Sequence, residues 1–96
     1  MIINNKTYTI PDLNFNAICK LEDMGIALTN MDKMILSTVR GFLALCMNGD
    51  FEKAGSELEA HLENGGSLDE ILQEINNAVE QSGFFQALNK TAKKEA

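Results

Sequence analysis

The fold is decided by the opening stretch MIINNKTYTIPDLNFNAICKLEDMG, residues 1–25. Two β-prone segments, Ile2–Ile3 and Thr7–Ile10, flank Asn4-Asn5-Lys6, and asparagine tolerates the left-handed backbone of tight turns. We therefore predict a two-stranded hairpin, which ends at Pro11 because proline cannot donate a hydrogen bond to a β-ladder. A hairpin this short is marginally stable alone, so we expect it to pack on the rest of the protein.

The hairpin leads directly into a first helix, predicted from about Phe15 to Met24. Asn14 is a favourable N-cap, and Gly25 is a favourable C-terminal stop. Helical spacing places several apolar residues on one side of this helix, which we expect to face the core. These residues are Phe15, Ile18 and Leu21, with Cys19 beside them.

A second helix is predicted from about Met31 to Met47, with Asn30 as its cap. It is apolar around most of its circumference, and a helix of that kind is normally buried at the centre of a fold. Gly41 lies inside it at a cost of about 1 kcal/mol relative to alanine, which favours a close contact at that point. Asn48-Gly49-Asp50 ends this helix and caps the next one. Its two apolar stripes are Met31, Ile35, Phe42 and Cys46, and Leu36, Val39, Leu43 and Met47.

Two amphipathic helices follow. The third helix is predicted near Phe51 to Glu63, and Asn64-Gly65-Gly66 breaks it. Ser67-Leu68-Asp69-Glu70 is a capping box that starts the fourth helix. Ser82-Gly83 interrupts that helix, and Phe84 to about Asn89 forms a last helical turn or two. The residues expected to point inward from the third helix are Phe51, Ala54, Leu58 and Leu62.

Together these elements predict a mostly α protein, a small bundle of four to five helices with a short N-terminal β-hairpin (α+β). The chain has 96 residues, 45% of them hydrophobic, which is enough for one modest core. We predict a single helical domain over residues 1–89, with the hairpin at 1–10, and a flexible tail at 90–96.

Composition excludes several classes of function. The net charge is −6, with nine acidic residues and one basic residue between Asp50 and Glu80. Such a surface repels phosphate backbones, so we predict no binding to nucleic acid. The longest apolar run, Met34–Met47, contains Arg40 and is shorter than the ~18 residues of a membrane span, so we predict no membrane association. Because no apolar leader follows Met1–Ile3, we expect a cytoplasmic protein with free thiols.

No arrangement typical of an enzyme or of a cofactor or metal site is visible, so we predict a protein without catalytic activity. His61 lies on the flank of an apolar stripe, which favours a packed histidine. Cys19, Cys46 and His61 lack the paired spacing of zinc ligands. The stretch that starts at Asp50 resembles a calcium loop, but Ala54 and His61 occupy ligand positions five and twelve. We interpret Asp50 as a helix cap.

The end of the chain offers the best candidate for a partner-binding site. Two adjacent aromatic residues on a short helix cannot both point inward. We therefore predict partner binding at Phe84, Phe85 and Leu88, since aromatic residues are favoured anchors in interfaces. The alternative is that one ring lies in the core and the other lies over it. The methionine-rich second helix is a further candidate for a binding groove, although a core role fits it better.

Five stretches of the chain also follow a known pattern: Ile2–Pro11, Leu13–Gly25, Leu36–Arg40, Asn64–Ser67 and Phe84–Leu88. In these stretches the chain resembles the tail assembly chaperones of long-tailed (siphophage-type) bacteriophages of Gram-positive hosts. The similarity extends over nearly the whole chain. It carries no catalytic motif and no set of site residues.

The resemblance implies a non-enzymatic protein of a phage or prophage that takes part in virion morphogenesis. It would coat the tape-measure protein, keep it soluble and recruit tail-tube subunits, acting as a homo-oligomer. It would work in the host cytoplasm and be absent from the mature virion. Many members also exist in a longer form made by a −1 ribosomal frameshift, for which the codons of Lys93-Lys94 are a suitable position.

A second class of function fits the composition as well. A small acidic intracellular adaptor or inhibitor protein could use the same charge against a basic protein partner. A minor enzyme subunit is a third class. Helical oligomers that bind a tape-measure segment would favour the chaperone, whereas a discrete one-to-one complex with a basic protein would favour the adaptor.

Overall fold

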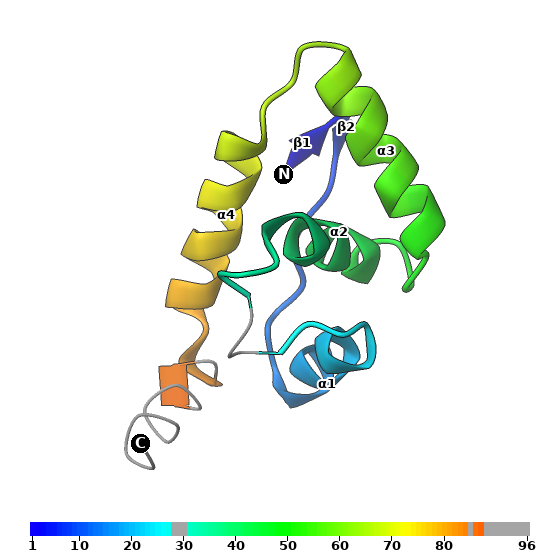
Figure 1. Cartoon of the computed structure of the whole chain (residues 1–96). Coiled ribbons are helices and arrows are strands. Elements are labelled where there is room, and N and C mark those ends of the chain that lie inside the picture. The colour runs from blue at the N-terminus through cyan, green and yellow to red at the C-terminus, as the bar shows by residue number, and fades with distance from the viewer. Residues whose placement is uncertain (28–30, 85, 88–96) are drawn as a thin grey trace.

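A computed structural model describes residues 1–27, 31–84 and 86–87 of the chain. It is mostly helical with a short N-terminal hairpin, as predicted. The central helix α2 contacts α1, α3 and α4, and it lies between α3 and α4 in Figure 1. The elements are β1 (Ile2–Ile3), β2 (Lys6–Thr7), α1 (Phe15–Asp23), α2 (Ile35–Leu45), α3 (Phe51–Glu63) and α4 (Leu68–Gln81).

The predicted hairpin is present but shorter than expected. Its strands are antiparallel, with Ile2 opposite Thr7 and Ile3 opposite Lys6. Asn4 and Asn5 have φ angles of +53° and +64°, so both adopt the left-handed conformation of a two-residue hairpin turn. Because the turn uses only the two asparagines, Lys6 belongs to β2 rather than to the turn.

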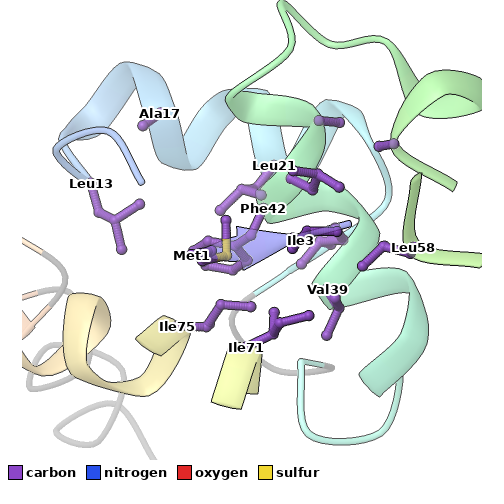
Figure 2. Close-up of a cluster of buried hydrophobic side chains, with 14 of the residues drawn as sticks. Met1, Ile3, Leu13, Ala17, Leu21, Val39, Phe42, Leu58, Ile71 and Ile75 are labelled. Atoms are coloured by element: carbon purple, nitrogen blue, oxygen red, sulfur yellow. The ribbon is translucent and has the colours of Figure 1, made fainter. Parts of the chain in front are cut away.

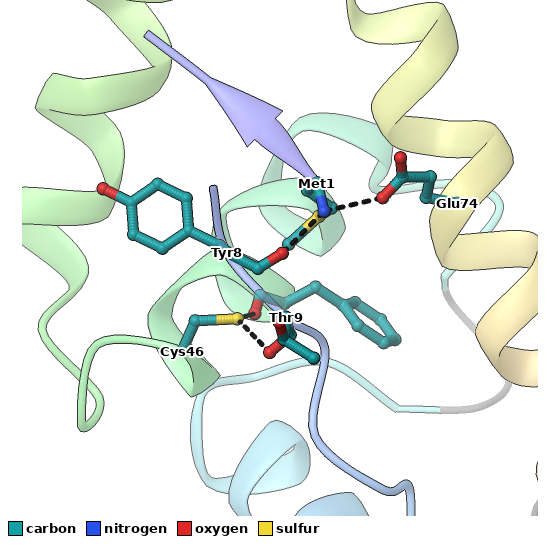
Figure 3. A network of polar contacts seen from close by, with 6 residues as sticks. Met1, Tyr8, Thr9, Cys46 and Glu74 are labelled. Carbon is teal, nitrogen blue, oxygen red and sulfur yellow. Dashed lines mark hydrogen bonds and ion pairs between the residues drawn. The ribbon is translucent and has the colours of Figure 1, made fainter. Parts of the chain in front are cut away.

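Polar contacts attach the hairpin to two different helices. The Met1 ammonium donates to the Tyr8 carbonyl at 2.6 Å and forms an ion pair with Glu74 of α4 at 2.7 Å (Figure 3). The Cys46 thiol, just after α2, donates to the Thr9 carbonyl at 3.3 Å. These contacts, together with the buried side chains beneath them, provide the support that an isolated hairpin lacks.

The hydrophobic core draws on the hairpin and on every helix (Figure 2). Phe42 and Leu43 of α2 are fully buried, so the prediction that this helix is central is confirmed for its middle part. The other large side chains that are almost fully buried are Ile3, Leu13, Leu21, Val39 and Ile71.

Gly41 marks a close approach, as predicted. A Cβ atom at this position would overlap the Cδ1 atom of Ile26, which is itself buried. The partner is therefore the segment after α1, not a residue within a neighbouring helix. This contact, and not only the apolar face, sets how closely the end of α1 packs on α2.

Three predicted N-caps are confirmed. In each, the side-chain oxygen accepts a hydrogen bond from a backbone N–H in the first turn of its own helix. The caps and their donors are Asn14 and Ala17 (2.9 Å), Asp50 and Lys53 (3.1 Å), and Ser67 and Asp69 (3.0 Å).

The predicted start of the second helix was wrong. The helix begins at Ile35 rather than at Met31, and its N-cap Met34 makes no side-chain capping bond. The Thr38 hydroxyl instead donates to the Met31 carbonyl at 3.2 Å, which holds the preceding turn against the helix. The proposed cap, Asn30, lies outside the described residues.

Four predicted core positions were also wrong, because Phe15, Ile35, Leu36 and Leu62 are exposed. In α1 the buried face is formed by Ala17, Ile18 and Leu21, and Phe15, the first residue of the helix, lies outside this face. Leu62 lies in the last turn of α3, which ends at Glu63. None of the helices in the described part of the chain is long and apolar enough to cross a membrane.

Candidate protein-binding surfaces

The first candidate surface is a groove between α2 and α3 that reaches the start of α4. Its volume is about 180 Å³, comparable with the ~150 Å³ cavity that holds a benzene molecule inside a protein. We call it the α2–α3 groove. It is lined by Leu36, Ser37, Val39, Arg40, Gly55, Leu58, Leu62 and Leu68.

The groove has an apolar floor and exposed apolar edges. Val39 and Leu58 form the floor and are buried, whereas Leu36 is 69% and Leu62 is 42% exposed. The apolar stripe to which Leu36 belongs predicts burial for it, and that prediction was wrong. Leu36 lies in the first turn of α2, where its neighbour Ile35 is also exposed. Exposed leucines beside an apolar floor make this groove a candidate for a surface that another protein covers.

Charged residues border the groove unevenly. Arg40 lies at one end, where its guanidinium is 5.0 Å from the centre of the Phe51 ring. The exposed charges on the neighbouring side of α3 are acidic. At 100° per residue, Glu59, Glu52 and Glu63 lie within about 100° of Leu62 around the helix, whereas Lys53 lies on the opposite side.

The second candidate surface contains one of the predicted partner-binding residues. Phe84 is half-buried in the helical turn after α4, and its ring packs on Phe15 of α1 with centroids 5.5 Å apart and planes at 48°. Phe15 is 63% exposed, so the pair presents an aromatic surface. We call this the Phe15–Phe84 pair. The other two predicted residues, Phe85 and Leu88, lie outside the described residues.

The remaining polar side chains near the hairpin form a structural network. The Asn4 backbone N–H donates to His61 Nδ1 at 2.9 Å, and the Lys6 ammonium donates to Glu57 at 2.9 Å. The hydrogen bond from Lys6 lowers the pKa of the Glu57 carboxyl, and the same contact raises the pKa of Lys6. Each contact joins the hairpin to α3, so His61 serves here to position the hairpin turn.

The two cysteines are both half-buried and free. Burial raises the pKa of the Cys46 thiol, and the same thiol donates to a backbone carbonyl. Among the residues that the structure describes, no three His, Cys, Asp or Glu side chains are placed to hold a metal ion.

Comparisons with protein-family models, curated proteins and solved structures gave no match. Sequence reasoning identified Phe84 but missed Phe15, Leu36 and Leu62, because each of these fits an apolar helical stripe. One available signal was position: all three lie in the first or last turn of their helices, where the core ends.

Proposed function

We propose that this protein is a phage tail assembly chaperone that binds the tape-measure protein, keeps it soluble and recruits tail-tube subunits. The resemblance of five sequence stretches to that family supports the proposal. The structural observation that supports it best is the α2–α3 groove, an exposed apolar surface on a strongly acidic helical protein. It is the kind of surface that a chaperone of another helical protein requires.

In this proposal the protein binds apolar surface of the tape-measure protein for a limited time. A tape-measure protein exposes apolar helical surface until the tail tube encloses it, and exposed apolar surface promotes aggregation. Each chaperone molecule would cover part of that surface while its net charge of −6 keeps the complex in solution. Several copies would act along one tape measure, in line with the expected homo-oligomer, and would leave before the virion is complete.

The alternative is a small acidic adaptor or inhibitor that binds one basic protein. It is favoured by the acidic outer side of α3 next to the groove, since such a surface attracts basic partners of any kind. The two functions differ in stoichiometry. A chaperone coats a long partner in many copies, whereas an adaptor forms a discrete complex.

Co-expression tests the proposal. The DNA downstream of the gene is sequenced for a slippery site at Lys93-Lys94 and for a tape-measure gene, which is then expressed with and without this protein. We expect the tape measure to become soluble only in co-expression, in a complex with several copies of this chain by light scattering after size-exclusion chromatography. A tape measure that remains insoluble would reject the chaperone, and a one-to-one complex with a basic protein would support the adaptor.

A further inference from the structure

Along α3, the α2–α3 groove is as long as two turns of a helical ligand, and its volume of about 180 Å³ suits the side chains of such a helix. On α3 its lining runs from Gly55 to Leu62, a distance of about 10 Å along the helix axis, or two turns. Leu36 of α2 and Leu68 at the start of α4 supply apolar contacts beside it. A partner helix that presents apolar residues at positions i, i+3 or i+4, and i+7 would place them along this length.

The charged residues around the groove indicate which kind of partner helix it would bind. Glu52, Glu59 and Glu63 are exposed on the side of α3 that adjoins the lining, and Asp69 and Glu70 are exposed beside Leu68. The one basic lining residue, Arg40, lies against the Phe51 ring at the opposite end from Leu62. Most of the length of the groove therefore lies next to acidic side chains.

A second copy of this chain is a poor occupant for the same reason. Two copies meeting through this face would bring their acidic edges together, and like charges brought together at an interface oppose association. Lysine or arginine beside an apolar stripe would instead be attracted to those edges.

We propose that the α2–α3 groove is the docking site for an amphipathic helix of the partner whose apolar stripe is flanked by lysine or arginine. That this helix belongs to a tape-measure protein rests on the proposed function. The chemistry of the helix follows from the lining and the acidic edge. Binding uses the leucines for affinity and the carboxylates for attraction and orientation.

Three synthetic 18-residue peptides test the recognition. One has a leucine stripe flanked by lysines, one has the same stripe flanked by glutamates, and one has the lysines with the leucines permuted so that no stripe forms. Each is titrated into the full-length ¹⁵N-labelled protein while backbone resonances are followed. We expect only the first peptide to bind below millimolar concentration, with the largest shifts around Leu36, Leu58 and Leu62, and with weaker binding at higher salt.

Matched variants test the site. Leu36→Ser and Ile2→Ser each replace an apolar residue of similar exposure, 69% and 65%, and only the first lies in the groove. We expect Leu36→Ser to weaken binding of the lysine–leucine peptide at least tenfold and Ile2→Ser less than twofold. A second pair of variants tests the charges. The double variant Glu59→Gln/Glu63→Gln should weaken binding about threefold and reduce its dependence on salt, whereas the control Glu22→Gln/Glu80→Gln, on other helices, should do neither.

Several results would overturn the proposal. These are equal effects of Leu36→Ser and Ile2→Ser, equal affinity for the glutamate peptide, shifts centred on another surface such as the Phe15–Phe84 pair, or self-association through the groove that Leu36→Ser abolishes. Failure of the proposed function is distinguishable. If Leu36→Ser still binds and solubilises the tape measure, the chaperone stands and this docking site does not. If the peptide binds the groove but the tape measure does not bind, the docking site stands and the partner is another protein.

Discussion

The middle and the first turn of α2 are both apolar, but only the middle is buried. Its middle, around Val39 and Phe42, is buried by α1, α3, α4 and the hairpin (Figure 2). Its first turn, Ile35 and Leu36, is also aliphatic but is 47% and 69% exposed. Local sequence cannot separate these regions, since burial depends on which other elements reach each turn. The buried region stabilises the fold, and the exposed region is available for a partner.

The largest effect should come from the buried part of α2. Phe42→Ala removes a fully buried ring from the centre of the core, and large cavities of this kind destabilise by about 3–5 kcal/mol. We expect a correspondingly lower midpoint of urea unfolding followed by circular dichroism. Phe15→Ala is a matched control, because that ring is mostly exposed and should cost far less. Similar losses for the two variants would mean that α2 is not the centre of the core.

A smaller effect is expected at Gly41, where the core is tightest. The new methyl group of Gly41→Ala would overlap Ile26 Cδ1, while alanine favours the helix by about 1 kcal/mol. Because Ile26 is buried, we expect moving its side chain to cost more than the helix propensity gains, with a net loss of about 1 kcal/mol.

Ile26→Val removes the Cδ1 atom and provides the test of this contact. In the double variant Gly41→Ala/Ile26→Val the added methyl group has room, so the combined loss of unfolding free energy should be smaller than the sum of the single losses. Additive losses in a double-mutant cycle would show that the two side chains do not compete for the same space.

The sequence was sufficient to predict the helices and the hairpin, but not which of their side chains other elements bury. Turn and cap residues act locally, which is why Asn4-Asn5, Asp50 and Ser67 predicted the hairpin turn and two helix starts correctly. The start of α2 was missed because its N-cap, Met34, makes no side-chain capping bond and so leaves no cap residue in the sequence to find. Helical spacing shows which side of a helix Phe15 and Leu36 face, and it therefore predicts a core position for both. It does not show whether a neighbouring element extends far enough to bury them. The second helix was named as a candidate for a binding groove, but a core role was preferred for it, since its lining residues resemble core.

A pH-dependent effect is expected where the hairpin meets α3. The pKa of Glu57 is lowered by its hydrogen bond from Lys6, so the contact stabilises the fold above the ordinary carboxyl pKa and is lost as the pH falls through the lower folded-state value. We expect Glu57→Gln to be less stable than the unmodified protein at pH 7, and we expect this difference to be smaller at pH 3. Urea midpoints at the two pH values measure this difference. Glu59→Gln, on the exposed side of the same helix, should show no such dependence, and an unchanged difference at pH 3 would rule out the ionised contact as its source.

The smallest effect on stability should come from Leu36→Ala, and it completes the comparison within α2. Leu36 is more exposed than buried, and alanine and leucine have similar helix propensities, so the free energy of unfolding should change by less than about 0.5 kcal/mol. The same variant should nevertheless lose much of its affinity for a basic amphipathic helix, because binding and not folding buries this side chain. A urea midpoint together with a titration of the lysine–leucine peptide measures both quantities on one sample. A large loss of stability would place Leu36 in the core, and the first turn of α2 would then stabilise the fold as its middle does.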